Sequence, residues 1–292
     1  MDEHSRIASV IIPNYNRKSD LARLLPSIAN QTFGGYEVII IDDFSPDRSV
    51  VEYISDFVRD RKNMRLVENA ENIGFVRTCN KGIKLCTSKY ICILTNDTEV
   101  ADNFIQRNVE IMDADDSIGV LSCIVVDDEG NNWFSGGIMK AGFPINLRDD
   151  FTGVRPVDYV AGTAPFYRRE VFERVGLLEE ALYMYNEDVE FCLRLKRATD
   201  YKTCMFGEKL VTHHMQPYDS VPDKVFYYCH RNHMMILKKY YPKYMPKVML
   251  DYLKETVKLV IIAALRLRIS YFKRALYIVR GTLSGLVKGY SE

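Results

Sequence analysis

Polar, mostly acidic residues follow three short apolar segments in the first part of the chain. PNYNR follows the first segment at residues 13–17, DDFSPD follows the second at 42–47, and NDTE follows the third at 96–99. Carboxylates in such positions can accept hydrogen bonds from the N–H and hydroxyl groups of a nucleoside, or hold a divalent cation that bridges phosphate oxygens. The acid pair of the second segment suits the first use, and Asp97 suits the second.

A later acidic cluster offers a second kind of chemistry. Glu187, Asp188 and Glu190 crowd the start of a predicted helix, and Arg194 follows Glu190 by four residues. Acids in a first turn often serve only as partners of the helix dipole, and the Glu190–Arg194 spacing matches an ordinary ion pair on a helix face. The functional interpretation is a general base, Asp188, with Glu187 as its orienting neighbour.

A histidine pair, His213 and His214, follows the apolar residues Leu210 and Val211. An isolated histidine is usually structural. His213 could also complete a metal shell that begins with Asp97, because imidazole is a common ligand of divalent metals.

These side chains need elements that bring them together, and the apolar periodicity predicts alternating strands and helices. Strands are expected at residues 8–13, 36–41, 64–68, 90–94 and 118–126, and helices at 20–31, 50–61, within 72–86 and at 104–112. This alternation predicts an α/β fold with a largely parallel sheet. Asp, Asn and Pro after a strand are common turn formers. Three such segments at the edge where open α/β sheets bind ligands favour a binding site instead.

The remaining chain divides into a connecting region and a helical tail. Residues 127–157 are rich in Gly, Asp and Asn, which predicts long loops and short strands over a binding face. Helical spacing returns at 169–175 and 186–198, and from residue 223 the chain is expected to be helical with a break near 241–246.

The 292 residues are enough for one large domain or two small ones. We expect a catalytic domain over residues 1–222, with a nucleotide-binding half at about 1–126 and an acceptor half at about 127–222. A basic amphipathic helical region would follow over residues 223–292.

The charge of the chain is balanced in total but not along its length. The 39 basic and 39 acidic side chains argue against a chain-wide nucleic-acid footprint. From Lys238 onward there are 12 basic and 3 acidic residues, a charge of +9, so residues 1–237 carry −9. Arg266, Lys273 and Arg280 recur every seven residues among apolar side chains, which fits a helix lying on an anionic membrane. The alternatives are a helical cap on the catalytic domain and a contact between copies of the chain.

Three features favour a cytoplasmic protein that contacts the cytoplasmic face of a membrane peripherally. The seven cysteines are scattered without a close pair, as is typical of core residues in a reducing compartment. The start MDEHSRIAS lacks the apolar stretch of a signal peptide. The longest uncharged apolar run, 259–265, is far shorter than the ~20 residues that a membrane span needs.

Two common nucleotide-binding motifs do not occur in the sequence. No Gly-x-Gly-x-x-Gly follows the first apolar segment and there is no Walker A lysine loop, which argues against a dinucleotide oxidoreductase and a P-loop NTPase. A nucleotidyltransferase also uses an α/β sheet and metal carboxylates. It would need a glycine-rich basic phosphate loop near the N-terminus, and PNYNRKSD is not one.

Seven segments spanning residues 9 to about 214 carry a family resemblance. They are SVIIPNYNR, EVIIIDDFSPDRS, ENIGFVRTCNKGI, ICILTNDTEV, VAGTAPFYRREVFERVG, YNEDVEFCLRL and KLVTHH. In this order they resemble the inverting family 2 glycosyltransferases with the GT-A fold, most of all the rhamnosyltransferase-like branch of bacterial polysaccharide enzymes. The resemblance implies a mostly parallel sheet flanked by helices, followed by a C-terminal helical extension.

The resemblance also implies how the nucleotide of the donor is bound. The residues that would line the nucleotide pocket are Pro13, Tyr15 and Asn16. The base and ribose would be held by Asp42 or Asp43 together with Arg77.

The resemblance extends to a metal site. Asn96-Asp97-Thr98 takes the place of the family's Asp-x-Asp motif, in which Asp97 matches the metal-binding carboxylate. His213 matches a late histidine that reaches the metal, here Mn²⁺ or Mg²⁺. Because Asn96 replaces an acid and removes one charge, a protein that kept the fold but lost activity is the alternative.

The chemistry that the resemblance implies is a single displacement. Asp188 matches the catalytic base beside Glu187, Gly162 and Thr163 lie where the family places the donor sugar, and Glu179 matches an acid near the acceptor. The sugar would pass from a UDP-sugar or dTDP-rhamnose to a hydroxyl of a saccharide or lipid-linked saccharide.

Overall fold

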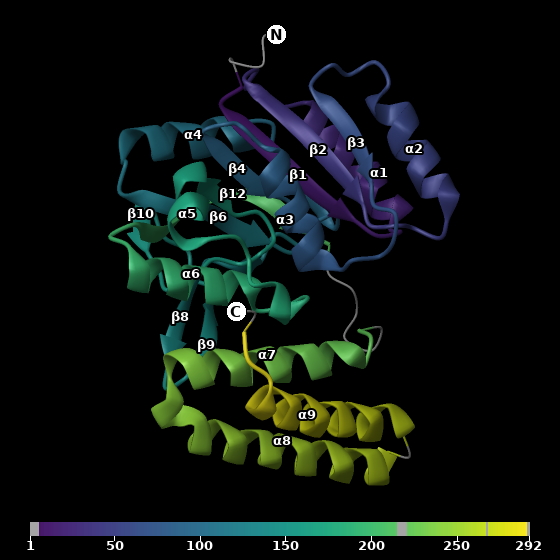
Figure 1. Cartoon of the computed structure of the whole chain (residues 1–292), viewed down its shortest axis with the longest axis vertical. Coiled ribbons are helices and arrows are strands. Elements are labelled where there is room, and N and C mark those ends of the chain that lie inside the picture. Colours follow the sequence, from purple (N-terminus) through teal and green to yellow (C-terminus); the bar gives the residue numbers. More distant parts are fainter. Residues whose placement is uncertain (1–5, 215–220, 267, 291–292) are drawn as a thin grey trace.

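The computed structural model describes residues 6–214, 221–266 and 268–290. A mixed β-sheet with flanking helices forms one part of the molecule (Figure 1). Below it in this view lie three helices, α7 (Lys224–Tyr240), α8 (Met245–Arg266) and α9 (Ile269–Val287). The expected α/β fold with C-terminal helices is confirmed.

The strands of the sheet do not follow the order of the sequence. From one edge to the other the sheet contains β10 (Val154–Pro156), β12 (Lys202–His213), β6 (Ile118–Val126), β11 (Phe166–Arg168), β4 (Tyr90–Ile93), β1 (Ala8–Asn14), β2 (Tyr36–Asp42) and β3 (Met64–Glu68). The longest ladders, β12–β6, β1–β2 and β2–β3, are parallel, whereas β11 is antiparallel to both neighbours. The carboxyl ends of β1, β2 and β4 therefore meet at one edge.

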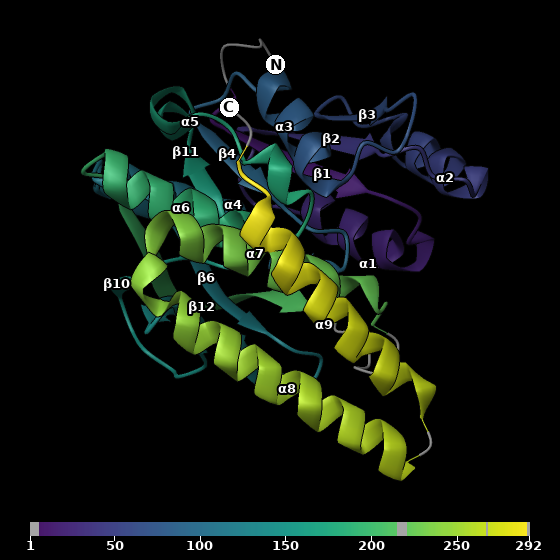
Figure 2. The same ribbon diagram turned by 60° about the horizontal axis from the view of Figure 1, so that its bottom comes forward.

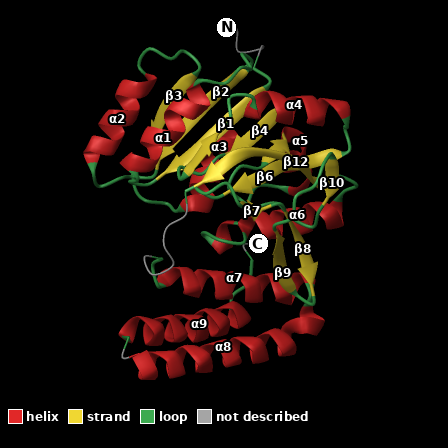
Figure 3. Ribbon diagram, turned by 180° about the vertical axis from the view of Figure 1, so that it is seen from behind, coloured by secondary structure: helices red, strands yellow, loops and turns green. Residues whose placement is uncertain are grey.

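Short strands fill the region for which loops and short strands are expected. β5 (Thr98–Val100) pairs with β12, and β7 (Asn132–Phe134) pairs with β6. β8 (Gly136–Lys140) and β9 (Phe143–Leu147) form a separate hairpin. Figure 3 shows this hairpin reaching from the region of the sheet toward α7.

The helices that flank the sheet form because one stripe of each is apolar. They are α1 (Lys18–Ala29), α2 (Arg48–Val58), α3 (Phe75–Leu85), α4 (Phe104–Ala114), α5 (Arg169–Val175) and α6 (Glu187–Ala198). In α1, Leu21, Leu24, Leu25 and Ile28 recur at helical spacing and are fully buried. β1 and β2 are buried at every position, as expected for strands that are covered on both faces.

The helix α9 packs against both α7 and α8. Gly281 and Gly285 permit the close approach to α7, because a Cβ at either position would lie 2.4 Å from a backbone oxygen of that helix. In Figure 2, α8 and α9 lie side by side and run in opposite directions. No helix in the described part of the chain is both long and apolar enough to cross a membrane.

Candidate active site

A cavity of about 820 Å³ opens at the carboxyl ends of β1 and β4. Its walls also include β7, the β8–β9 hairpin, the segment that leads into α6, and the first turns of α7. The volume lies within the range of ~300–1,000 Å³ that is typical of small-molecule sites. Its position matches the edge at which open α/β sheets bind ligands.

The acid Asp43 lies in the wall of the cavity, just after β2. Its carboxylate accepts hydrogen bonds from Asn69 Nδ2 at 2.8 Å and from the amides of Ile73 and Gly74, each at 2.9 Å. These bonds fix the loop that enters α3. Gly74 has a φ of 88°, a left-handed conformation that glycine adopts without strain.

The neighbouring acid, Asp42, is fully buried beneath the cavity rather than in its lining. It accepts a hydrogen bond from Asn14 Nδ2 at 2.9 Å, and Asn14 Oδ1 accepts one from Asn96 Nδ2 at 2.8 Å. Asp42 therefore orients the amide of Asn96, which does line the cavity, through a chain of two hydrogen bonds.

The side chains of Asp97 and His213 meet because β12 pairs with β5. The antiparallel ladder places His213 opposite Thr98, and His213 Nε2 lies 3.5 Å from Asp97 Oδ1. The ring of Trp133 stands edge-on to the imidazole, with 4.4 Å between centroids. All three side chains line the cavity.

This pair fits a divalent cation that takes its other ligands from a diphosphate and water. Burial, the largest single influence, raises the pKa of Asp97, but His213, Thr95 and Arg17 together hold it below its usual value. The ionised carboxylate and the imidazole nitrogen are donors that suit Mn²⁺, and Mg²⁺ commonly binds one or two carboxylates plus phosphate oxygens. Among the described residues, no group of three or more His, Cys, Asp or Glu could hold a metal alone.

The carboxylates of Glu187 and Asp188 line the cavity where α6 begins. Asp188 Oδ2 accepts a hydrogen bond from the Gly162 amide at 2.7 Å, and Oδ1 accepts one from the Val189 amide at 2.7 Å. A Cβ at Gly162 would lie 3.1 Å from Glu187 Oε1 and 3.4 Å from Asp188 Oδ2. Glycine at this position therefore lets both carboxylates approach the backbone.

Burial gives the two adjacent carboxyl groups different protonation behaviour. It raises the pKa of Glu187, and the charge of Asp188 raises that pKa further. Burial also raises the pKa of Asp188, but the amides of Val189 and Gly162 oppose this shift. Glu187 Oε2 has no hydrogen-bond partner within the described ranges. Asp188 is therefore the member that ionises first, and Glu187 keeps its proton to higher pH.

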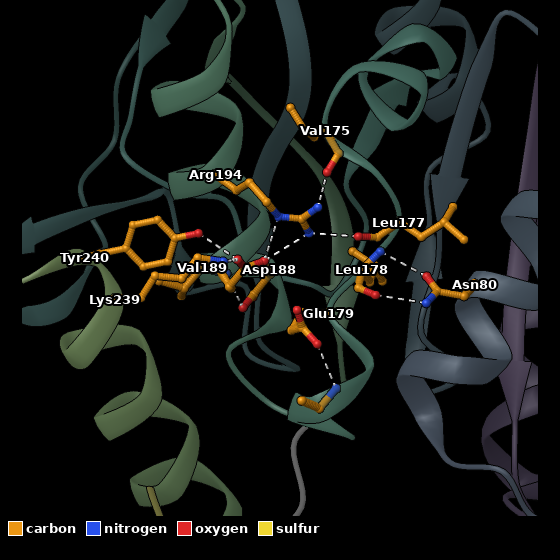
Figure 4. Close-up of polar contacts among 12 residues, drawn as sticks. Asn80, Val175, Leu177, Leu178, Glu179, Asp188, Val189, Arg194, Lys239 and Tyr240 are labelled. Carbon is orange, nitrogen blue, oxygen red and sulfur yellow. Dashed lines mark hydrogen bonds and ion pairs between the residues drawn. The ribbon is translucent and has the colours of Figure 1, made fainter. Parts of the chain in front are cut away.

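The helix that carries Asp188 is anchored by a buried ion network. Glu190, fully buried, accepts hydrogen bonds from Tyr240 Oη at 2.7 Å and Lys239 Nζ at 3.1 Å, and its other oxygen lies 3.0 Å from Arg194 Nη2. Arg194 also donates to the backbone carbonyls of Val175, the last residue of α5, and of Leu177 in the loop that follows (Figure 4). The Glu190–Arg194 pair expected on a helix face is present, and the bonds of Glu190 to Lys239 and Tyr240 join α6 to α7.

The cavity brings together most, but not all, of the residues that the sequence singles out. Those in its lining are Pro13, Tyr15, Asp43, Asn96, Asp97, Gly162, Thr163, Glu187, Asp188 and His213. Outside the lining, Arg77 pairs with Glu180 at the surface, and Glu179 accepts a hydrogen bond from the Ala181 amide. Asn16 also lies outside it, and its buried Oδ1 has no hydrogen-bond partner in the described part of the chain.

The lining also contains side chains that the sequence analysis did not select: Arg17, Trp133, Tyr183, Tyr185 and Lys224. The sequence could have pointed to two of these residues, because Tyr183 and Tyr185 lie shortly before the acidic pair in YMYNED. No such signal exists for Lys224, since it reaches the site only through the packing of α7 against the rest of the molecule.

In comparisons with known proteins, the chain is similar to glycosyltransferases. Residues 9–176 match the family described as Glycosyl transferase family 2. An uncharacterized glycosyltransferase of Haemophilus influenzae is 26% identical over 208 residues, which cover 69% of this chain and 66% of that protein. The amylovoran biosynthesis glycosyltransferase AmsB of Erwinia amylovora is 24% identical over 213 residues, 71% of this chain and 69% of AmsB. A second H. influenzae glycosyltransferase is matched over only 62% of its length.

Solved structures share the fold at low sequence identity. The crystal structure of GalNAc-T7 with UDP, GalNAc and Mn²⁺ has a TM-score of 0.68 at 18% identity, covering 88% of this chain and 51% of that one. The structure of Staphylococcus aureus TarS has a TM-score of 0.59 at 18% identity, covering 79% and 39%.

Proposed function

Since the chain belongs to glycosyl transferase family 2, we propose that it is an inverting enzyme that moves a sugar from a nucleoside diphosphate to a hydroxyl group. The observation that carries the proposal is the Asp188 carboxylate, which the Gly162 amide holds in the same cavity as the Asp97–His213 pair. A positioned base can accept the proton of the attacking hydroxyl, and a cation in the same cavity can stabilise the departing nucleoside diphosphate.

Asp188 acts as the general base in this proposal. It accepts the proton of the acceptor hydroxyl while that oxygen attacks the anomeric carbon, and the bond from this carbon to the diphosphate breaks in the same displacement. The anomeric configuration inverts, and no covalent intermediate forms. Glu187, which keeps its proton longer, limits the buried pair to one negative charge near neutral pH.

The donor would lie along the edge of the sheet formed by β1, β2 and β4. Asp43 and Tyr15 would contact the base and ribose, and Asn96 would contact the ribose or the diphosphate. A divalent cation, Mn²⁺ or Mg²⁺, held by Asp97 and His213 would neutralise charge on the diphosphate. The GalNAc-T7 structure, which shares the fold and contains UDP and Mn²⁺, supports the use of a divalent cation with a nucleoside diphosphate.

The proposed substrates belong to the assembly of bacterial surface polysaccharides. The donor would be a UDP-sugar or dTDP-rhamnose, and the acceptor a saccharide or a lipid-linked saccharide. AmsB and the minor teichoic acid biosynthesis protein GgaA of Bacillus subtilis support this class, the latter being 24% identical over 208 residues. The match covers 46% of GgaA and 68% of this chain.

The helices α8 and α9 would place the enzyme on a membrane. Ten of their exposed apolar side chains form what we call the apolar stripe: Leu250, Leu253, Val257, Ile261 and Leu265 of α8, and Ile269, Phe272, Leu276, Val279 and Leu283 of α9. Each helix buries its opposite side, with Leu259 of α8 packed against Ala275 and Ile278 of α9. The stripe therefore faces away from the body of the protein.

The charge of the surrounding side chains supports an anionic bilayer as the partner of the apolar stripe. Lys254 and Lys258 border the stripe on α8, and Lys273 and Arg280 border it on α9. Each basic residue near an anionic surface contributes ~1 kcal/mol to membrane binding. We place the protein at the cytoplasmic face of a membrane, where a lipid-linked acceptor would lie within reach.

A panel of nucleotide sugars tests the proposed reaction. Each UDP- or dTDP-linked sugar is added with Mn²⁺ or Mg²⁺, the Tm is measured, and released nucleoside diphosphate is detected in the presence of saccharide acceptors. The true donor should raise the Tm, because it binds only the folded state. The product should have the anomeric configuration opposite to that of the donor. A product with the donor's configuration would contradict the displacement.

A further inference from the structure

The turn formed by residues 181–186, which leads into α6, has an unusual backbone. Tyr183, Tyr185 and Asn186 have φ angles of 64°, 66° and 63°, and none of them is glycine. L-residues with bulky side chains adopt this left-handed region only where the surrounding structure enforces it. Such residues concentrate at functional sites, and all three of these line the cavity.

Two buried side chains of α7 hold this turn. Asn232 Nδ2 lies 2.9, 2.7 and 2.7 Å from the carbonyl oxygens of Leu182, Met184 and Tyr185. Arg231 Nη2 donates to the carbonyl of Leu182 at 2.7 Å and to that of Ala181 at 2.8 Å. Four carbonyls of the turn, those of residues 181, 182, 184 and 185, therefore accept hydrogen bonds from two adjacent residues of α7.

The two residues also fix each other. Arg231 Nε donates to Asn232 Oδ1 at 2.8 Å, which directs the amide nitrogen of Asn232 toward the turn. Asn232 is fully buried and Arg231 nearly so, and the hydrogen bonds that Arg231 makes with Asn232 and the turn all go to uncharged groups. Its buried charge is compensated by the carbonyls of the turn and the ring of Tyr228 at 5.0 Å.

The turn sets the position of the catalytic carboxylates. It ends at Asn186, the residue before α6, whose Nδ2 donates to the Cys229 carbonyl of α7 at 3.2 Å. Glu187 and Asp188 follow directly. A change in the backbone at Tyr185 or Asn186 would therefore move the Asp188 carboxylate away from the Gly162 amide.

We infer that Arg231 and Asn232, here called the α7 clamp, are positioning residues that hold the 181–186 turn in its left-handed form and so fix the general base. Neither side chain lies in the lining of the cavity, and each acts through the turn. The inference rests on the proposed function, because it assigns the clamp to the base of the transfer. Misplacing a catalytic group by about 1 Å can cost ~100-fold in rate.

The test compares three variants of the full chain. Asn232→Ala removes the amide, and Arg231→Lys keeps the charge but loses the planar guanidinium that binds the turn through Nη2 and Asn232 through Nε. Ser284→Ala is the matched control, because it removes a hydrogen bond between α9 and Tyr227 of α7 without touching the turn. Amide hydrogen exchange of peptides covering residues 181–190 and steady-state kinetics are measured for each. UDP affinity is followed through the fluorescence of Trp133, the only tryptophan in the chain.

We expect both clamp variants to exchange faster at residues 181–190 and to lose ~10- to 100-fold in kcat. Their UDP affinity should fall by less than kcat, because the clamp reaches the nucleotide end of the cavity only through Tyr183, whose carbonyl accepts a hydrogen bond from the Val76 amide. Ser284→Ala should match the wild type in all three measurements. If Asn232→Ala does not fold, Arg231→Lys decides the matter.

Two results would overturn the inference. One is unchanged exchange and turnover in Arg231→Lys. The other is an equal loss of kcat and UDP affinity together with faster exchange throughout the chain, which would make the clamp a general stability element. The exchange measurement does not depend on transfer activity, so it tests the clamp even if the proposed reaction fails. Failure of the base assignment is recognised separately by full activity in an Asp188→Asn variant, and failure of the reaction by the absence of nucleoside diphosphate release from every donor in the panel.

Discussion

Asp188 and Glu187 are neighbours in the chain, yet their surroundings differ in one respect that decides their roles. Asp188 accepts two backbone hydrogen bonds, whereas one oxygen of Glu187 is buried without a hydrogen-bond partner among the described residues. Hydrogen bonds to a carboxylate stabilise its charged form, and burial without them favours the neutral form. The proposed base and its neighbour are thus distinguished by geometry rather than by residue type.

Asp188→Asn keeps the shape of the side chain but cannot accept a proton. We expect kcat to fall ~100- to 10,000-fold, the usual effect of losing a general base. UDP affinity should change little, because the nucleotide end of the cavity is untouched. Steady-state kinetics and UDP titration measure the two effects. A variant with more than half of the wild-type turnover would exclude Asp188 as the base.

Glu187→Gln should make the stability of the protein less dependent on pH. The pKa of Glu187 is higher in the folded than in the unfolded state, so the folded state binds more protons between these two values, and stability falls as pH rises through that window. Glutamine removes this loss. The Tm of the variant minus that of the wild type should therefore increase as the pH rises from about 5 to about 8. A Tm difference that stays constant across this range would contradict the assignment.

Asp97→Ala tests the proposed cation site. We expect weaker UDP binding in Mn²⁺ or Mg²⁺ and little change in EDTA, because the carboxylate would act on the diphosphate through the cation. Titration of UDP into both proteins, with and without EDTA, makes the comparison. An equal loss of affinity under both conditions would mean that Asp97 contacts the ligand directly or supports the fold.

At the scale of elements, the strand β12 shows where prediction from the sequence ends. The expected strands and helices up to residue 126 match the observed ones to within a few residues, because each buries a regular apolar pattern. β12 was not predicted. Its sequence KTCMFGEKLVTH places Gly207, Glu208 and Lys209 in the middle of the strand, and its register against β6 shifts there. A bulge of this kind breaks the alternation on which a strand prediction depends.

Because β12 is not predicted from the sequence, part of the site cannot be predicted either. Asp97 and His213 can be selected from their residue types and from the family resemblance. Their contact, however, depends on the antiparallel pairing of β12 with β5, which is a long-range event. Trp133 and Lys224 were missed for the same reason, because tertiary packing alone brings them to the cavity. The sequence therefore predicts the acidic residues that follow the strands, but it does not predict that β7 and α7 form walls of the cavity.

The apolar stripe on α8 and α9 can be tested with two substitutions. Leu253→Glu and Phe272→Glu place charges at side chains that are 58% and 55% exposed, so the fold should tolerate them. We expect the double variant to lose most of its binding to phosphatidylglycerol-containing vesicles in a sedimentation assay. Wild-type binding should also weaken with salt, because surface charges are screened within ~8 Å at physiological ionic strength.

The control for this experiment is Val154→Glu on β10, a position that is 47% exposed and lies outside the stripe. It should bind vesicles as the wild type does. If the double variant and the control bind equally well, α8 and α9 do not face a membrane. In that case a contact between copies of the chain becomes the better explanation of the stripe.

At the scale of the whole molecule, α7 connects the sheet with the C-terminal pair of helices. Lys224 and Cys229 of α7 line the cavity, and Lys239 and Tyr240 bind Glu190 of α6. The domain boundary expected at residue 222 stays a prediction. The position of α7 makes a catalytic unit that extends to residue 240 the more natural choice.

Removing α9 should therefore affect the whole protein. A chain that ends at Arg266 would expose the side of α7 against which Gly281 and Gly285 now pack. We expect a lower Tm and reduced turnover, because the uncovered helix also carries the α7 clamp. Thermal unfolding and kinetics of the shortened chain measure both effects. An unchanged Tm and turnover would show that α9 is dispensable for the fold.

The apolar stripe also has a consequence for kinetics. An enzyme that lies flat on a bilayer meets a lipid-linked acceptor by lateral diffusion, so the encounter takes place in two dimensions. The relevant acceptor concentration is then its mole fraction in the lipid rather than its amount per volume. Diluting the acceptor with inert lipid at constant total acceptor should slow the reaction, whereas diluting the whole suspension with buffer should leave the turnover of each bound enzyme unchanged.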